Sequence, residues 1–422
     1  MARPRQAGGC RPAAVSLPHK PGNAEAANPR VVFVTTFYPN AQDPTRTVFV
    51  ENLARALRAQ LALRVIAPVP YAPPLQRWSK LRGVARIERR HGITVEHPRY
   101  VVVPRMGWLS GLSFALAVLR PLARLARRHP GLLVHAHCGY PDAVGVGLAS
   151  RLLGLRYVVT CHGSDLNVYS HRLGLRPQMR WALRQAAHVI AVSSPLRQRV
   201  LQLLGSGADA HCSVIPCAAV DPEVFHVDPD RDGLRRRLGV PLEAKIVVSI
   251  GKLVPIKGLP LLIQAWSALG ARGRVGADDA LLIIGTGPEG PRLRRMAESS
   301  AAPIRFLGPL GQVELADWLR AADLLCLPSL NEGTPNVVIE ALASGRPVVA
   351  SRVGAVPEFV REGSSGLLVQ PGDAVQLAEA LEHALGRSWP ERDMADSVAQ
   401  YSWQHIAQAN AVVLRAAAGC SR

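Results

Sequence analysis

Residues 329–358, SLNEGTPNVVIEALASGRPVVASRVGAVPE, decide the fold of this chain because they combine a loop, a turn and a helix in one short stretch. The apolar run at residues 323–328, DLLCLP, comes directly before them and is typical of a strand buried in a parallel sheet. The Gly-Thr-Pro turn at residues 333–335 and the following Asn336 predict the start of a helix, and Gly345 predicts its end. This order of elements indicates an open α/β sheet, which binds ligands beyond the carboxyl ends of its strands.

Two glutamates stand on either side of this turn, and both can reach one ligand. Glu332 lies on the predicted loop, and Glu340 falls in the second turn of the predicted helix. Ionised carboxylates only accept hydrogen bonds and hydroxyl groups are the matching donors, so the pair favours a polyol such as a hexose joined to a ribose. Backbone N–H groups at the helix start would face an anion. Taken alone, such a pair is also common on solvated helices, so both interpretations stay open at this point.

The rest of the chain alternates short apolar runs with helical patterns. This alternation predicts an α/β fold with parallel sheets built from βαβ units. A length of 422 residues exceeds what one hydrophobic core usually serves, so two domains are expected. Proline and aspartate cluster at residues 215–230, which is the predicted boundary. The predicted strands are residues 31–34, 63–66, 132–134, 157–160 and 189–192 before that boundary, and 281–284, 304–307 and 323–328 after it.

The stretch at residues 329–358 resembles the donor-site motif of the family 4 retaining glycosyltransferases, and the resemblance extends over almost all of the chain from about Arg30. It implies the GT-B fold, in which two Rossmann-like domains with parallel sheets face each other. The implied division is a disordered tail at residues 1–29, an N-terminal acceptor domain at 30–219, a nucleotide-sugar donor domain at 220–400, and at 401–422 a C-terminal crossing helix and tail.

The resemblance places the donor site in the C-terminal half. It implies that Glu332 contacts hydroxyls of the transferred sugar and that Glu340 holds the nucleotide ribose. The pattern SIGKL followed by KG, residues 249–258, resembles the family's basic pair for the donor diphosphate, with Lys252 where arginine is usual. A lysine is a point charge without the guanidinium fork, so geometric specificity should fall while phosphate binding remains. The residues expected to bind the nucleotide sugar are Glu340, Lys252, Lys257, Gly333, Thr334, Pro335, Asn336 and Val337.

A second motif follows a predicted strand in the N-terminal half. Residues 162–165, HGSD, resemble the family motif whose histidine, here His162, lies near the transferred sugar. An imidazole can donate to a sugar hydroxyl or to a phosphate oxygen, and Asp165 is expected to orient either the histidine or the loop. A single histidine after a strand is more often structural, so this assignment depends on the resemblance. The expected catalytic residues are His162, Glu332, Lys252 and Lys257.

One position departs from the family pattern. Relatives usually carry glycine in the loop after the first strand, where a bare backbone lets the diphosphate or the acceptor approach closely. The loop here reads PTRTVFV, residues 44–50, and Thr47 stands at the glycine position. A side chain at this point opposes that close approach. Arg46 could supply compensating positive charge.

Charge is divided unevenly along the chain. Lys and Arg outnumber Asp and Glu by 29 to 12 through Asp230 and by 21 to 19 beyond it, so +17 of the net charge of +19 lies in the first part. A strongly basic N-terminal half favours binding to an anionic partner, which could be nucleic acid, an anionic membrane or an anionic acceptor. Nucleic acid is the least favoured partner, because the arginines lack interleaved aromatic residues and only 5% of the chain is aromatic.

The segment at residues 101–128 is the most suggestive part of this basic half. Its longest uncharged run, residues 106–119, is too short to span a bilayer, and four arginines follow within residues 120–128. The pattern predicts either an interfacial segment on anionic lipid or a core helix with a solvated basic end. In the family this region often meets the membrane or a lipid-linked acceptor, which favours the interfacial interpretation.

The cysteines give no sign of a disulfide framework or a metal site. Cys212 and Cys217 are close in sequence, but no second pair accompanies them, and no metal is assigned to His135, His137 and Asp142. Residues 1–29 lack the long apolar core of a signal peptide, which favours a cytoplasmic enzyme with free thiols. The seven cysteines are Cys10, Cys138, Cys161, Cys212, Cys217, Cys326 and Cys420.

The predicted function is a hexosyltransferase that moves a sugar from a nucleoside diphosphate sugar to an acceptor hydroxyl with retention of configuration. Two lysines can neutralise the leaving diphosphate, so neither a metal nor another cofactor is expected. The preferred acceptor is a glycan or lipid-linked oligosaccharide of exopolysaccharide or envelope synthesis, with peripheral contact on the inner face of the cell membrane. A nucleotide-sugar epimerase or a phosphorylase of the same fold, or an inactive partner protein of an assembly complex, are the alternatives.

Overall fold

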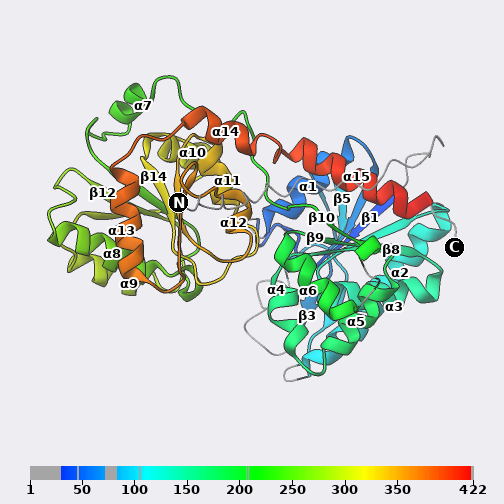
Figure 1. Ribbon diagram of the computed structural model, residues 1–422. Coiled ribbons are helices and arrows are strands. Elements are labelled where there is room, and N and C mark those ends of the chain that lie inside the picture. Colours follow the sequence, from blue (N-terminus) through cyan, green and yellow to red (C-terminus); the bar gives the residue numbers. More distant parts are fainter. Residues whose placement is uncertain are drawn as a thin grey trace, which may run out of the picture.

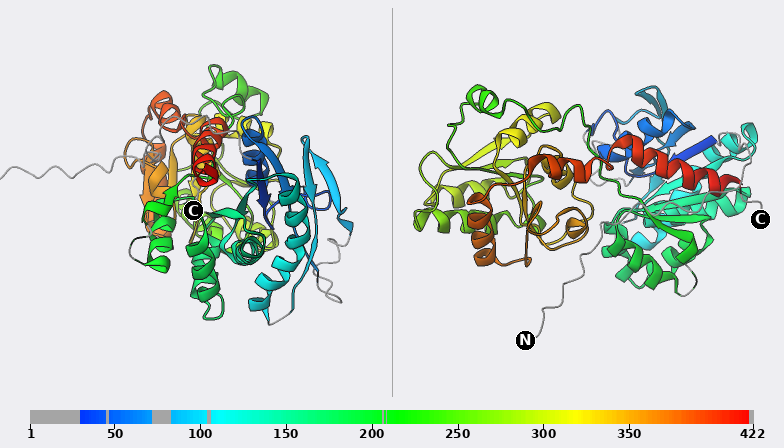
Figure 2. Two further views of the ribbon diagram at one scale, coloured as in Figure 1. Left: turned by 90° about the vertical axis from the view of Figure 1, so that its right-hand side faces the viewer. Right: turned by 45° about the horizontal axis from the view of Figure 1, so that its top comes forward.

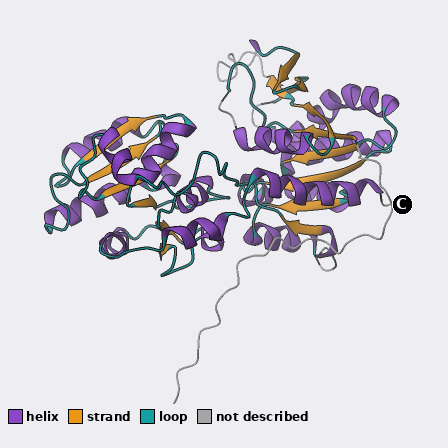
Figure 3. Ribbon diagram, turned by 90° about the horizontal axis from the view of Figure 1, so that it is seen from above, coloured by secondary structure: helices purple, strands orange, loops and turns teal. Residues whose placement is uncertain are grey.

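Two domains, each built on its own sheet, lie side by side in the computed structural model, which describes residues 30–44, 47–71, 83–103, 106–205, 207 and 209–419 (Figure 1). The strands of both domains lie between layers of helices (Figure 3). The expected α/β architecture with two parallel-sheet domains is therefore confirmed. The predicted tail at residues 1–29 and Arg46 lie outside the described residues.

The N-terminal sheet has eight strands in the order β10-β9-β8-β7-β1-β2-β5-β4, and β4 is antiparallel to β5. Its other neighbouring pairs are parallel. The bounds are β1 (Arg30–Val34), β2 (Ala62–Ile66), β4 (Ile87–Arg90), β5 (Ile93–Glu96), β7 (Leu133–His137), β8 (Arg156–Cys161), β9 (His188–Ala191) and β10 (Cys212–Val214), with β3 (Val69–Tyr71) and β6 (Arg99–Val101) paired separately. One correction concerns β7, which runs to His137, so His135 and His137 lie inside this strand instead of beyond it.

Helices cover both faces of this sheet. Alternate side chains of β1 point to opposite faces of the sheet and join different hydrophobic cores. Val32 and Val34 pack under α2, α3, α5 and α6. Val31 and Phe33 pack under α1 and α15. The helices are α1 (Val48–Arg58), α2 (Ser110–Arg128), α3 (Val144–Leu153), α4 (Ser164–Asn167), α5 (Arg176–Gln185), α6 (Ser194–Leu204) and α15 (Trp403–Gly419).

The C-terminal sheet has six parallel strands in the order β13-β12-β11-β14-β15-β16. Helices α8, α9 and α13 cover one face, and α10, α11, α12 and α14 cover the other. The strands are β11 (Ile246–Ile250), β12 (Ala280–Ile284), β13 (Ile304–Gly308), β14 (Leu324–Leu327), β15 (Val348–Ser351) and β16 (Gly366–Val369). The helices are α7 (Arg231–Arg237), α8 (Leu259–Ala271), α9 (Gly290–Glu298), α10 (Gln312–Ala321), α11 (Asn336–Ala343), α12 (Val356–Phe359), α13 (Ala374–Leu385) and α14 (Glu391–Val398).

The chain crosses between the domains twice, and the two crossings touch. The Val220 N–H donates to the Tyr401 carbonyl at 2.9 Å, and Val220 forms a parallel bridge with Ser402. After this contact α15 runs back along the N-terminal domain, where Ile406 and Leu414 join the core under β1 (Figure 2). The C-terminal helix therefore braces the N-terminal domain, as expected.

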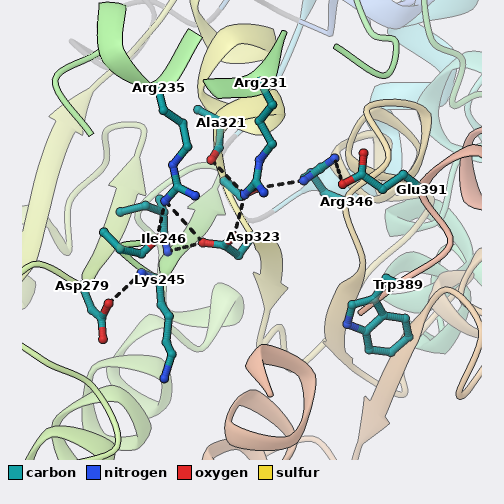
Figure 4. Close-up of polar contacts among 12 residues, drawn as sticks. Arg231, Arg235, Lys245, Ile246, Asp279, Ala321, Asp323, Arg346, Trp389 and Glu391 are labelled. Atoms are coloured by element: carbon teal, nitrogen blue, oxygen red, sulfur yellow. Dashed lines mark hydrogen bonds and ion pairs between the residues drawn. The ribbon is translucent and has the colours of Figure 1, made fainter. Parts of the chain in front are cut away.

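A cluster of arginines and carboxylates fixes the end of the first crossing (Figure 4). Arg231 at the start of α7 pairs with Asp323 at 2.6 Å, and the other oxygen of Asp323 accepts from the Ile246 N–H at 2.6 Å. Arg346 is buried and pairs with Glu391 at 2.5 Å. Ile246 begins β11, and Asp323 directly precedes the neighbouring β14. This cluster therefore anchors α7 at the amino ends of the strands, opposite the carboxyl ends that carry the donor loop.

Helix α2 has a buried face and an exposed apolar face within the segment at residues 101–128. Phe114, Val118 and Leu122 are fully buried, as in a core helix, whereas Leu112 and Leu116 are 53% and 65% exposed. By length and composition Gly107–Arg128 is long and apolar enough to cross a membrane, and 39% of its apolar 18-residue window is buried inside the protein.

Candidate active site between the domains

The donor loop lies between β14 and α11 and is held by close backbone approaches. A Cβ on Gly258 would lie 2.1 Å from the Pro328 carbonyl oxygen, and a Cβ on Gly354, where φ is +54°, would lie 2.1 Å from the Glu332 oxygen. Only glycine fits at these two points. The loop that carries Glu332 is therefore clamped between two neighbouring loops at the carboxyl ends of the strands.

The structure brings Glu332 and Lys257 into direct contact, although they are 75 residues apart. Lys257 Nζ lies 2.5 Å from Glu332 Oε1, and the Ser329 hydroxyl donates to the same oxygen at 2.6 Å. The Glu332 side chain is only 9% exposed. Both contacts use Oε1, so Oε2 remains available to accept from sugar hydroxyls, and the ammonium group keeps further protons for a phosphate oxygen.

Lys252 is placed differently from Lys257. It is exposed on the loop after β11, and within the described part of the chain no ion pair is recorded for it. The glycines of the turn at residues 285–287 allow this loop to pack, because a Cβ on Gly285 would lie 1.9 Å from the Gly251 oxygen. The glycine-rich turn therefore supports the loop that carries Lys252.

Glu340 lies in the second turn of α11 and is half-buried. Burial raises the pKa of its carboxyl group to about 7. No hydrogen bond or ion pair of this carboxylate is recorded among the described residues, so its oxygens lack donors that nucleotide ribose hydroxyls would supply. Pro335 precedes the helix, and the first N–H groups of α11, at Asn336 and Val337, have no partner within it.

On the N-terminal side, His162 follows β8, and its Nε2 lies 3.3 Å from Nδ1 of His137. Burial lowers the pKa of His162 to about 4, so the ring is neutral near pH 7. Asp165 orients the loop, since it accepts from the backbone N–H groups of Gly163 and Gly139 at 2.8 Å each. Of the two roles considered for Asp165, the contacts therefore favour the loop over the imidazole ring.

The two half-sites meet at these loops. A Cβ on Gly333 would lie 3.1 Å from the His162 carbonyl oxygen, so the donor loop passes directly against the histidine loop. The Thr334 hydroxyl donates to the Val192 carbonyl at 3.3 Å across the same junction. Sequence reasoning assigned no contact to Val192 or to Ser329, although Ser329 opens the donor motif and Val192 ends a predicted strand, because neither side chain has a chemical signature of its own.

A further contact between the domains involves Glu358, the last residue of the stretch that decides the fold. Its carboxylate accepts from the Ser194 N–H, at the start of α6, at 2.8 Å. Burial raises the pKa of Glu358. Glu358 thus joins the two domains and does not add a third carboxylate to the donor loop.

Thr47 adopts the backbone conformation that suits glycine. Its φ and ψ are +42° and 51°, in the left-handed region, at the residue before α1. Its hydroxyl is buried and has no hydrogen-bond partner. A β-branched residue in this region is strained, so Thr47 stands at a position whose backbone geometry favours glycine.

The five described cysteines are free thiols, and four of them are buried. Cys10 and Cys420 lie outside the described residues. Within the described ranges no group of three or more His, Cys, Asp or Glu side chains is placed to hold a metal ion.

Comparison with protein families gives two matches that together span most of the chain. Residues 47–223 match the model described as Glycosyltransferase Family 4, and residues 244–387 match Glycosyl transferases group 1. TuaC of Bacillus subtilis (strain 168), named as a glycosyltransferase of teichuronic acid biosynthesis, is 32% identical over 361 residues, which cover 83% of this chain and 88% of TuaC.

Solved structures share the fold at lower identity. Anabaena Alr3699/HepE in complex with UDP has a TM-score of 0.66 at 20% identity, over 90% of this chain and 97% of HepE. Sucrose-phosphate synthase from Thermosynechococcus elongatus has a TM-score of 0.65 at 21% identity, over 90% of this chain and 96% of that one.

Proposed function

We propose, from the premise that this chain belongs to the family 4, group 1 glycosyltransferases, that it transfers a hexose with retention from a nucleoside diphosphate sugar to an acceptor hydroxyl. The observation that carries the proposal is the contact of Lys257 and Ser329 with Glu332, on a loop that passes against His162. The junction thus combines the Glu332 carboxylate, which can accept hydrogen bonds from sugar hydroxyls, the Lys257 ammonium group, which can bind phosphate, and the neutral His162 ring.

Each group has a distinct part in the proposed reaction. Lys252 and Lys257 neutralise the charge that develops on the leaving diphosphate, and Glu332 accepts hydrogen bonds from the transferred sugar. Glu340 accepts from the ribose. The acceptor hydroxyl approaches from the N-terminal side, and the leaving phosphate takes its proton on the same face of the sugar, which retains the anomeric configuration.

Metal independence is part of the proposal, and the two lysines support it, because they supply the positive charge that a bound cation supplies in other enzymes. The first donors to test are UDP-sugars, since the HepE structures include complexes with UDP and with UDP-glucose. A thermal-shift and hydrolysis screen of UDP-, GDP- and ADP-sugars with and without EDTA tests this directly. Stabilisation by one nucleotide that survives EDTA supports the proposal, and stabilisation abolished by EDTA overturns metal independence.

The proposed acceptor is a glycan or lipid-linked glycan of envelope polysaccharide synthesis, used by a cytoplasmic enzyme in peripheral contact with the membrane. The likeness to TuaC supports an envelope polysaccharide. Leu112, Leu116 and Arg120 recur every four residues on one face of α2 and are exposed, and Trp108, just before the helix, is 50% exposed. Such a face can enter the headgroup region while arginine meets anionic lipid.

Sedimentation with anionic liposomes at low salt tests this contact. The wild type should bind, and the double variant Leu112→Ser and Leu116→Ser should bind several-fold more weakly with an unchanged melting temperature. Failure of the wild type to bind removes the membrane from the proposal. Turnover of a nucleotide sugar without any acceptor would instead favour an epimerase, and phosphate-dependent release of a sugar phosphate would favour a phosphorylase.

A further inference from the structure

Three histidine rings form a column that ends at the junction of the domains. His135 and His137 lie on the same face of β7, with ring centroids 4.2 Å apart, and His137 stacks on His162 at 5.6 Å with planes 14° apart. Phe33 packs against His135 and His137 at 4.9 and 4.4 Å. Both strand histidines are fully buried. The column therefore joins the core of the N-terminal domain to His162, whose loop passes against the donor loop.

The hydrogen bonds of the column leave specific ring nitrogens without partners. Nε2 of His135 contacts the Thr160 hydroxyl at 2.7 Å, and Nδ1 of His137 contacts Nε2 of His162 at 3.3 Å. Nδ1 of His135, Nε2 of His137 and Nδ1 of His162 are buried and have no partner in the described residues. Because Nε2 of His162 is already occupied, only Nδ1 of that ring can contact a ligand.

A neutral imidazole carries one N–H, so the contact between His137 and His162 has two arrangements. If His162 donates from Nε2, His137 must carry its proton on Nε2, which leaves an unpaired N–H inside the core. If His137 donates from Nδ1, the unpaired N–H is Nδ1 of His162, whose backbone lies against the donor loop. Both arrangements leave one buried N–H without a partner in the described residues. His137 is fully buried in its strand, whereas His162 is partly exposed on the loop that passes against the donor loop, so the second arrangement is favoured because a bound ligand can supply the missing acceptor there.

We propose that His137 is a positioning residue that donates from Nδ1 to Nε2 of His162 and thereby makes His162 present Nδ1–H to an oxygen of the sugar or the diphosphate. This inference rests on the proposed function, because it assumes that His162 lies at the transferred sugar.

The neutral state of the column fits this role. Burial lowers the pKa of His135 to about 3 and that of His137 well below its usual value. Asp165 is the nearby carboxylate that raises the pKa of His162, but burial outweighs it, and the Asp165 oxygens are held by backbone N–H groups. His137 therefore acts through the position of a proton on a neutral ring and not through charge.

Two variants of His137 separate positioning from packing. The side-chain amide of asparagine lies close to the place of Nδ1 and can still donate to His162, whereas that of glutamine lies close to the place of Nε2 and cannot. We expect His137→Asn to retain kcat within about 5-fold and His137→Gln to lose about 100-fold or more, the usual effect of a lost donor to a developing charge. The KM for the donor should change little in both.

The tautomer of His162 is measured independently by 15N NMR of the ligand-free protein. Protonated Nδ1 in the wild type, lost in His137→Gln and retained in His137→Asn, is the expected result. Protonated Nε2 in the wild type overturns the inference, as do equal losses of kcat and melting temperature in both variants. Absence of glycosyl transfer in the wild type would remove the proposed function but leave the tautomer result standing, so the two failures are distinguishable.

Discussion

The two domains bring opposite kinds of chemistry to their junction. The C-terminal side presents charge on the Lys257 and Glu332 pair and on the exposed Lys252, together with Glu340, whose pKa burial raises to about 7. The N-terminal side presents His162, which burial keeps neutral. Yet Lys and Arg outnumber Asp and Glu by 29 to 12 through Asp230 and only by 21 to 19 beyond it.

The difference teaches that the net charge of a domain does not describe its site. The arginines of the N-terminal half lie largely on outer surfaces, as Arg120 and Arg124 do on α2. Surface charge of this kind directs association with anionic partners and is screened by salt. At the junction, the Lys257 and Glu332 charges are instead paired and partly desolvated, and only Lys252 is exposed among these donor-site charges. The variants below test this division between the domains.

The largest effect should come from Glu332→Gln, which removes the charge that Lys257 and Ser329 hold in place. We expect kcat to fall by about 100-fold or more with a smaller change in the donor KM, because the carboxylate acts on the transferred sugar. Steady-state kinetics measure this, and a thermal melt controls for folding. Turnover close to that of the wild type would refute the donor-site assignment.

The two lysines should differ, because one is partly buried in an ion pair and the other is exposed. Lys257→Ala should lower kcat/KM by roughly 100-fold, and Lys252→Ala by roughly 10-fold, since an exposed charge is screened. Raising the salt concentration should shrink the Lys252→Ala defect relative to the wild type and leave the Lys257→Ala defect largely unchanged. Equal losses at all salt concentrations would show that exposure does not separate the two roles.

Glu340→Gln should weaken binding of the nucleotide about 10-fold, the usual cost of losing a hydrogen bond to a charged group. Its effect on stability has a defined direction, because the folded pKa is raised from 4.5 to about 7. The folded state holds a proton that the unfolded chain releases, so the wild type loses stability as the pH rises through this window. The variant should therefore melt higher than the ligand-free wild type at pH 8 and equally near pH 4.

The smallest effect should come from Thr47→Gly in the N-terminal domain. The left-handed conformation destabilises the folded state of a non-glycine residue by about 1–2 kcal/mol. Glycine removes this strain but loses about 0.5–1 kcal/mol more backbone entropy on folding, so the net gain in stability is smaller. We expect a rise of a few degrees in melting temperature and a change of kcat of at most a few-fold. Thr47→Ser keeps the hydroxyl and serves as the control. A lower melting temperature in Thr47→Gly would show that the buried hydroxyl stabilises the loop.

Sequence reasoning located most of the buried strands and the donor motif, because both depend on local patterns. Apolar runs such as residues 281–284 and 323–328 are continuous since both faces of the sheet are covered. The predicted strands did not include β3, β4, β5, β6, β10, β11, β15 or β16. Strands such as Ile87–Arg90 have exposed polar positions and little apolar signal, whereas the buried β15 lies inside the stretch that was interpreted as the donor motif.

The contacts that make the site could not be predicted in the same way. The pairing of Lys257 with Glu332 depends on how close the loops after β11 and β14 lie. The contact of His137 with His162 depends on the register of β7 and β8, in which His137 stands opposite Thr160. The bond between Thr334 and Val192 requires the placement of one whole domain against the other. Such placement is a tertiary property with no signature in a single loop.

The return of α15 to the N-terminal domain has a consequence for how the protein is made. Val31 and Phe33 share a core with Ile406 and Leu414, so one face of the first sheet, which α1 covers in part, is completed by residues near the end of the chain. Roughly 190 residues separate Val214 from Trp403, which corresponds to about 10–40 s of translation. During this time the domain that leaves the ribosome first is incomplete, and the apolar face under α15 is open to chaperones and to aggregation.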